Sequence, residues 1–317
     1  MRLYNDYLKD KYGCKVHRVA LDAGFSCPNM ESGGCIYCNS KGSRASYVVP
    51  SETIRQQLET RIQYLRKAKN AKKFIAYFQA HTNTYASVDE LKAAYDQATG
   101  FDDIAGISIG TRPDAVDREK LKLISSYKEN YEVWLEYGLQ SAHDRTLKLI
   151  NRGHTFDDFS NAVKLTKEFG IPVCAHVILG LPGETKLDMM ATAKKLAKLN
   201  IEGVKIHLLH ILKGSGLEKL YKEGKIGLLE QDEYVKLVCE FLSNLAPDII
   251  VQRLTGQGSK DDHIAPLWAL DKIGTIEKIK TVIGGGQGPT KSFDKSSGLR
   301  TEQSRNTKQS KFSLRPL

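Results

Sequence analysis

The sequence predicts an α/β protein built as a partial (β/α)6 barrel of the TIM type. Short runs rich in β-branched and aromatic residues alternate with longer segments of helical period, and this alternation is typical of βα units with a parallel sheet. Six such units in series are too few for a complete eight-stranded barrel, so an open or partial barrel fits better. A doubly wound open sheet is the alternative fold, and it would place the same loops along one edge.

The elements follow from the apolar runs and from the residues that punctuate them. We expect strands at residues 15–21, 73–78, 104–109, 132–139, 171–179 and 203–209, with a shorter run at 248–254. Helices are expected near 52–69, after the capping pair Ser87 and Glu90, from 117, over 156–169, from 185 and near 231–245. In barrels of this type the chemistry gathers on loops after the carboxyl ends of the strands, so these loops should line one mouth.

Composition and charge limit the class of protein. The 317 residues are 41% hydrophobic and 26% charged, as in globular proteins, and no apolar run reaches the length of a membrane span. We therefore expect a cytoplasmic protein with no membrane partner. The formal net charge of +10 fits a polyanionic partner, and half of this excess lies after residue 283. We expect a core over residues 1–250, a C-terminal extension over 251–283, and a basic, disordered tail over 284–317.

Three cysteines lie close together in the stretch GFSCPNMESGGCIYCNS, residues 24–40, directly after the first predicted strand. They are Cys27, Cys35 and Cys38. Three thiolates can hold three irons of a 4Fe-4S cubane and leave the fourth iron open to another ligand. A zinc knuckle with Cys14 or His17 as fourth ligand is the alternative, and the spacing alone does not separate the two.

The cysteine loop and three later stretches together resemble the radical SAM enzymes. In that family, three loop cysteines hold a 4Fe-4S cluster whose open iron binds S-adenosylmethionine. The C-x7-C-x2-C spacing departs from the commonest C-x3-C-x2-C pattern and is similar to the branch that contains the catalytic subunit of Elongator. TRPD (111–114), LEYGLQS…NRGHT (135–155) and HVILGLPGET (176–185) have counterparts there in the same order. GFSCPN, FQAHTNTYA and LQSAHDRTL most resemble the bacterial YhcC/YtqA group, over roughly residues 1–283.

The resemblance implies roles for individual residues. Cys27, Cys35 and Cys38 would ligate the cluster, and S-adenosylmethionine would be cleaved reductively to a 5′-deoxyadenosyl radical that abstracts hydrogen from the substrate. The residues expected to contact S-adenosylmethionine are Tyr37, Gln79, Glu136, Gln140, Gly180 and Gly183. The substrate-side candidates are His81, Asn83, Arg112, Arg152, His154, His176, His207 and Lys213. We assign no catalytic residue beyond the cluster.

The activity implied for the YhcC/YtqA group is of the MnmL type, which acts on the wobble uridine of tRNA. It would convert a carboxymethylaminomethyl group to aminomethyl. The implied partners are tRNA, an electron donor such as flavodoxin or ferredoxin, and a separate tRNA methyltransferase that acts next. Two alternatives stay open: radical chemistry on a small molecule or protein side chain, and a non-catalytic zinc protein that binds RNA.

Overall fold

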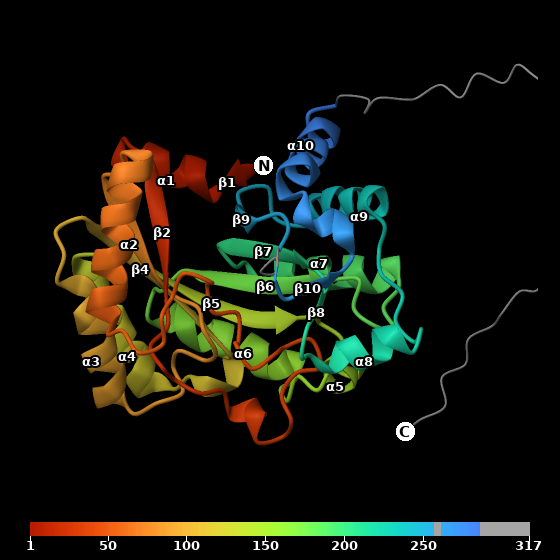
Figure 1. The fold of residues 1–317 in the computed structure, drawn as a ribbon, viewed down its shortest axis with the longest axis horizontal. Coiled ribbons are helices and arrows are strands. Elements are labelled where there is room, and N and C mark those ends of the chain that lie inside the picture. The colour runs from red at the N-terminus through yellow and green to blue at the C-terminus, as the bar shows by residue number, and fades with distance from the viewer. Residues whose placement is uncertain (257–260, 286–317) are drawn as a thin grey trace, which may run out of the picture.

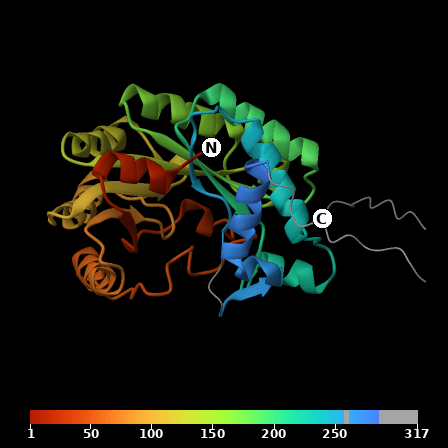
Figure 2. The same cartoon turned by 90° about the horizontal axis from the view of Figure 1, so that it is seen from above.

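The centre of the computed structural model is an eight-stranded parallel sheet that curves into an open barrel (Figures 1 and 2). The structure describes residues 1–256 and 261–285, so the predicted tail lies almost wholly outside the described residues. The strand order is β1-β9-β7-β6-β5-β4-β3-β2. In a doubly wound sheet the order reverses at a switch point, whereas β2 to β7 follow each other in chain order. The predicted partial barrel is therefore confirmed.

The six predicted strands of the barrel all form, with boundaries close to those expected. β2 to β7 are Val16–Leu21, Lys73–Phe78, Ile104–Thr111, Glu132–Gln140, Val173–Leu179 and Gly203–Leu208. The sheet is extended beyond β7 by β9 (Ile250–Arg253), which the sequence predicted, and by β1 (Arg2–Leu3), which it did not. A separate antiparallel pair joins β8 (Ile211–Leu212) to β10 (His263–Ala265).

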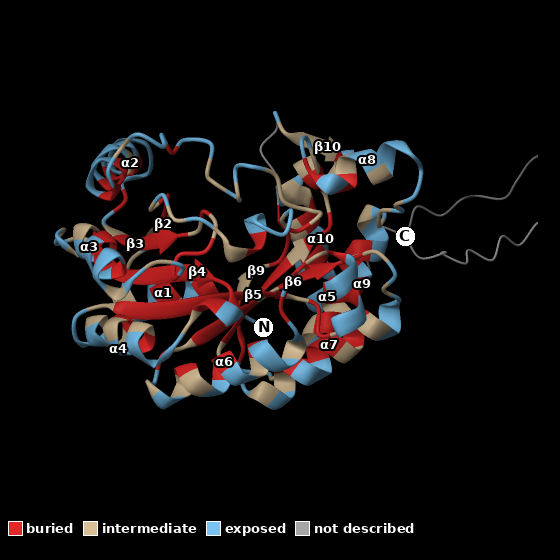
Figure 3. Ribbon diagram, turned by 90° about the horizontal axis from the view of Figure 1, so that it is seen from below, coloured by how far each residue is buried: buried red, intermediate tan, exposed pale blue. Residues whose placement is uncertain are grey.

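Helices cover the outer side of the curved sheet, and Figure 3 shows the strands buried between them and the outward helix faces exposed. The predicted helices are α2 (Ile54–Lys69), α3 (Val88–Thr99), α4 (Arg118–Ser126), α6 (Phe156–Glu168), α7 (Lys186–Leu199) and α9 (Gln231–Ser243). The sequence did not predict α5 (Asp144–Leu149), α8 (Gly216–Lys222) or α10 (Lys272–Ile283), the last of which packs against α9. Short 3-10 turns lie at Pro28–Met30, Pro113–Ala115, Tyr127–Glu129 and Leu267–Leu270.

Capping boxes begin two of these helices where the sequence placed them. Ser87 and Glu90 start α3, and Thr185 with Asp188 starts α7. In each box the first side chain accepts from the main-chain N–H three residues later, which satisfies a donor that the helix leaves unpaired. Among the described residues, none of the helices combines the length and apolar character that a membrane span needs.

The first helix, α1 (Tyr4–Tyr12), closes the amino-terminal end of the barrel and was not predicted. It contacts both β9 and β2, so it bridges the seam at which the sheet stays open. Tyr4 and Leu8 are buried in an apolar layer with Trp134 and Cys174. The Tyr4 and Trp134 rings meet edge to face, with centroids 5.7 Å apart. The barrel therefore has a closed apolar floor beneath its interior.

Shortening the α1 side chain that is buried deepest should destabilise this floor. Leu8 is 1% exposed, so Leu8→Ala removes packing atoms and leaves a cavity. We expect the free energy of unfolding of the apo protein to fall by about 2–5 kcal/mol, measured by urea denaturation. The control is Lys9→Ala on the exposed face of the same helix, which should change stability little. Equal stability of both variants would show that α1 does not seal the barrel.

Candidate active site at the barrel mouth

The loops after the strands meet at the carboxyl-terminal end of the barrel, as the sequence predicted. The cysteine loop, residues 22–53, contains only one 3-10 turn and lies against neighbouring loops. The Thr82 N–H, after β3, donates to the Ser26 carbonyl at 3.3 Å, and the Ile36 N–H donates to the Ile150 carbonyl, after β5, at 3.1 Å. The loop is therefore held by contacts to the barrel rather than by secondary structure of its own.

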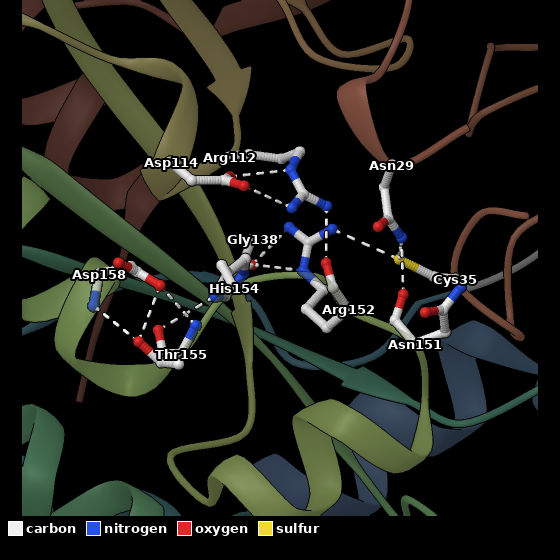
Figure 4. A network of polar contacts seen from close by, with 10 residues as sticks. All are labelled: Asn29, Cys35, Arg112, Asp114, Gly138, Asn151, Arg152, His154, Thr155 and Asp158. Atoms are coloured by element: carbon white, nitrogen blue, oxygen red, sulfur yellow. Dashed lines mark hydrogen bonds and ion pairs between the residues drawn. The ribbon is translucent and has the colours of Figure 1, made fainter. Parts of the chain in front are cut away.

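Cys35 lies at the centre of this contact (Figure 4). Its side chain is buried, and its Sγ accepts from Asn29 Nδ2 at 3.4 Å and from Arg152 Nη1 at 3.5 Å. A hydrogen bond with Cys38 and the charge of Arg152 lower the pKa of Cys35 to about 4, although burial opposes this shift. Cys35 is therefore a thiolate at neutral pH, and the thiolate is the form that binds metals.

The other two cysteines lie beside Cys35 on the same loop. The Cys38 N–H donates to the Cys35 carbonyl at 2.9 Å. A side-chain hydrogen bond with Cys35 and burial raise the pKa of Cys38, and the charge of Cys27 adds to this shift. Within residues 1–256 and 261–285, no group of three or more His, Cys, Asp or Glu side chains is placed to hold a metal ion. A cluster that takes one thiolate per iron does not require three sulfurs to converge on one ion. The donor set, with one thiolate already hydrogen-bonded by two N–H groups, fits such a cluster.

The NRGHT stretch after β5 holds the cysteine loop in place. Asn151 Nδ2 donates to the carbonyls of Ser32 and Gly34 at 2.8 and 2.7 Å, and the Asn151 carbonyl accepts from Asn29 at 2.6 Å. Gly153 has a φ of +78°, and a β-carbon there would lie 2.4 Å from Asn29 Oδ1. Only glycine therefore allows this close approach of the two loops.

Three predicted substrate-side residues are buried and engaged in contacts within the mouth (Figure 4). Arg152 donates from Nη2 and Nε to the Gly138 carbonyl at 2.6 and 3.1 Å, and His154 Nε2 lies 3.2 Å from the same oxygen. Arg112 donates to the Arg152 carbonyl at 2.7 Å and pairs with Asp114 at 2.6 Å. These side chains hold the end of β5 and the cysteine loop together.

The predicted S-adenosylmethionine contacts Tyr37, Gln79 and Gln140 are half-buried at the mouth. The Tyr37 hydroxyl is hydrogen-bonded with Cys35, and its ring packs on the apolar cluster beneath the loop. Gln79 Nε2 donates to the Ser43 carbonyl at 2.9 Å, which ties the end of β3 to the cysteine loop. Gln140 ends β5 with a φ of +74°. Their assignment to the cofactor remains a prediction.

The remaining mouth residues differ in exposure. Gly180 and Gly183 have φ values of +85° and +75°, so both lie in turn conformations that glycine adopts readily. Asn83 is buried and donates to a main-chain carbonyl of β4 at 2.8 Å, His81 is half-buried with a φ of +56°, and Lys213 is exposed. Their roles also remain predictions.

Glu136, His176 and His207 lie on strands rather than on the mouth loops. The fully buried Glu136 accepts from Lys205 Nζ and from His176 Nε2, the latter at 2.9 Å, and pairs with Arg18 Nη2 at 3.0 Å. Burial would raise the pKa of Glu136, but the charges of Lys205 and Arg18 hold it well below its usual range. The sequence analysis missed Arg18 and Lys205. The signal was present, since each is a cation inside a short β-run, VHRVAL and GVKIHL.

Comparisons with known proteins agree with this geometry. The model of the Radical SAM superfamily matches residues 26–196, and that of the Radical_SAM C-terminal domain matches residues 201–283. The chain is 40% identical over 291 residues to the uncharacterized protein YtqA of Bacillus subtilis, covering 90% of each. It is 37% identical over 283 residues to protein YhcC of Escherichia coli, covering 87% of this chain and 90% of YhcC.

The chain also resembles more distant proteins of the Elongator-like branch. The chain is 25% identical over 152 residues to the tRNA uridine(34) acetyltransferase of Dehalococcoides mccartyi, covering 47% of this chain and 32% of that protein. The solved structure of archaeal Methanocaldococcus infernus Elp3 superimposes with a TM-score of 0.60 at 19% identity, over 83% of this chain and 63% of that one, a likeness of fold. The Elongator-like branch expected from the cysteine spacing is thus confirmed. With its barrel, its three-cysteine loop and these relatives, the chain belongs to the radical SAM superfamily.

Proposed function

We propose that this radical SAM enzyme converts the carboxymethylaminomethyl group of the tRNA wobble uridine to aminomethyl. The observation that carries the proposal is the three-cysteine loop, held at the barrel mouth by Arg152 and Asn29. The substrate class comes from relatives, because one with partial similarity is named for uridine 34 of tRNA. A net charge of +10 is compatible with a polyanionic substrate.

The cysteines have the role of ligands in this proposal. Cys27, Cys35 and Cys38 would hold a 4Fe-4S cluster, which with S-adenosylmethionine supplies a 5′-deoxyadenosyl radical when both are bound. Arg152 and Asn29 donate N–H groups to the Cys35 sulfur, and such hydrogen bonds tune the cluster's reduction potential. Burial of Cys35 keeps water from this thiolate.

Around the cluster, the half-buried side chains and the two turn glycines at the mouth would bind S-adenosylmethionine. They are Tyr37, Gln79, Gln140, Gly180 and Gly183. Glu136, which was expected to contact S-adenosylmethionine as well, is left out of this proposal because it is fully buried and paired with Arg18 and Lys205. The exposed Lys213 would meet tRNA phosphate. We further propose an electron donor of the flavodoxin or ferredoxin type, a separate methyltransferase that acts on the aminomethyl product, and a core that ends near residue 250.

The cluster assignment is tested by metal content. After anaerobic reconstitution with iron and sulfide, the wild-type protein should bind about four irons per chain and form 5′-deoxyadenosine from S-adenosylmethionine in the presence of reductant. Cys27→Ala, Cys35→Ala and Cys38→Ala should each lose both properties. Cys14→Ala is the matched control and should keep them, because Cys14 lies outside the loop. Stoichiometric zinc that is lost in Cys14→Ala would instead support the zinc site.

The substrate assignment is tested by mass spectrometry of tRNA nucleosides. Cells that lack the gene should accumulate carboxymethylaminomethyluridine at the wobble position. Reconstituted protein with S-adenosylmethionine and reductant should convert this tRNA to the aminomethyl form, and the Cys38→Ala protein should not. A nucleoside profile that does not change on deletion of the gene would exclude the tRNA assignment and leave the cluster assignment standing.

The contact between Arg152 and Cys35 should be visible in the redox potential of the reconstituted protein. A reduced cluster carries one more negative charge, so loss of the guanidinium should make reduction harder. We expect Arg152→Met to lower the midpoint potential by roughly 60 mV, which corresponds to about 1.4 kcal/mol for one electron, in a titration followed by EPR. Arg152→Lys should give a smaller shift, and Arg118→Met, at an exposed pair with Glu168, should give none. An unchanged potential in Arg152→Met would remove the tuning role.

A further inference from the structure

We propose that the interior of the barrel, below the cysteine loop, binds the carboxylate of the substrate. The site is a layer of inward-facing side chains from six strands, which we call the interior layer. Its members are Arg18, Tyr77, Glu136, His176, Lys205 and Gln252. This inference rests on the proposed function, in which the substrate carries a carboxymethylaminomethyl group.

The interior layer is a connected network of charges. Glu136 contacts Lys205, His176 and Arg18. Tyr77 accepts a hydrogen bond from Lys205 Nζ at 2.9 Å, and its ring lies under the same ammonium, with the nitrogen 4.0 Å from the centroid. Because the members come from β2, β3, β5, β6, β7 and β9, closure of the barrel brings them together.

Positive charge exceeds negative charge in this layer. Two cations, Arg18 and Lys205, face one carboxylate, Glu136. Burial and the charge of Lys205 lower the pKa of His176 to about 4, so this imidazole is neutral and adds no charge at neutral pH. Burial and the charge of Arg18 lower the pKa of Lys205 to about 7, whereas the charge of Glu136 opposes this shift. Lys205 is therefore partly protonated at neutral pH, and a second carboxylate beside it would favour the charged form. An excess cation in a buried layer is costly, and a bound anion would offset that cost.

Buried polar atoms in and beside the layer have no hydrogen-bond partner within the described residues. They include Arg18 Nε, Gln252 Nε2, Ser108 Oγ and His207 Nε2, and also the acceptor Glu136 Oε1, which has an ion pair with Arg18 in place of a hydrogen bond. Arg18 Nε and Gln252 Nε2 are donors, and the hydroxyl of Ser108 can donate as well. An unsatisfied buried donor is costly, because it has given up its hydrogen bonds to water without gaining a partner. A ligand that accepts several hydrogen bonds would satisfy them, and a carboxylate is such a ligand.

The floor helix α1 lies below the layer, and two members of the layer are partly exposed. The Tyr4 ring of α1 covers Arg18 from the floor, with the guanidinium carbon 4.4 Å from its centroid. The side chains of Arg18 and His176 are 21% and 17% exposed, whereas those of Glu136 and Lys205 are 0% and 1% exposed. Arg18 and His176 are therefore the members of the layer that an anion would contact with the least rearrangement.

Two carboxylates could reach such a site, that of the substrate and that of S-adenosylmethionine. The depth of the layer favours the substrate. The Gly138 carbonyl accepts from Arg152, which also contacts Cys35 at the mouth. Glu136 lies two residues earlier on β5, which places it about 6–7 Å deeper in the barrel. In the proposed mechanism the methionyl group stays at the cluster, above this layer.

The test compares two anticodon stem-loops, one with carboxymethylaminomethyluridine and one with aminomethyluridine. Their affinities for the reconstituted protein are measured by fluorescence anisotropy without reductant, so that no turnover occurs. The wild-type protein should prefer the carboxylate-bearing stem-loop. Lys205→Met and Arg18→Gln should each reduce this preference at least about tenfold and leave the affinity for the aminomethyl stem-loop unchanged. Lys205→Arg should retain the preference, because it keeps the charge.

The control variant is Lys164→Met, at an exposed position on α6, which should bind both stem-loops as the wild-type protein does. The affinity for S-adenosylmethionine is measured in parallel and should not change in any variant. If the Lys205 and Arg18 variants keep the preference, the carboxylate site is wrong and the proposed function stands. If they lose S-adenosylmethionine and keep the preference, the layer binds the cofactor's carboxylate, which also overturns the inference. If the wild-type protein has no preference and converts neither tRNA, the proposed function itself fails.

Discussion

The contact between Arg152 and the Cys35 thiolate is the interaction on which the barrel mouth depends. The cysteine loop has almost no regular structure, so contacts with the rest of the barrel must set the positions of its sulfurs. Arg152 joins the two, because its Nη1 donates to Cys35 Sγ while its Nε and Nη2 donate to the Gly138 carbonyl near the end of β5. The sheet thereby holds a loop that has little secondary structure of its own, and a buried cation keeps the thiolate charged.

Burial has opposite effects on the stability of the interior layer and of the apolar floor beneath it. Apolar side chains in the floor gain stability by leaving water, whereas Glu136 and Lys205 lose hydration when they are buried. Replacement of a buried ion network by apolar residues is often neutral or stabilising, so stability alone gives no reason for it. If the excess cation binds the substrate carboxylate, that function explains why the buried ion network is present.

The sequence predicts most of the barrel because β2 to β7 are apolar runs separated by capped helices. The sequence does not predict α1, because the segment YNDYLKDKY buries only Tyr4 and Leu8 and has no side-chain cap. The three cysteines are recognisable because their ligand spacing is local. Arg18 and Lys205 are noticeable as cations inside β-runs, but their pairing with Glu136 is not predictable, because Glu136 lies far away in the chain and only closure of the barrel brings the three together.

The alternation of side chains along β5 orders the parts of the site by depth. Trp134 belongs to the floor and Glu136 to the interior layer. The Gly138 carbonyl accepts a hydrogen bond from Arg152, which contacts the cysteine loop. These positions share one face because a strand repeats every two residues. An anion held at Glu136's level and a cluster held at the loop would therefore face each other along the barrel axis. The C–H group that gives up its hydrogen atom would then lie between them, and the spacing of residues along β5 would contribute to the distance between the cluster and the substrate carboxylate.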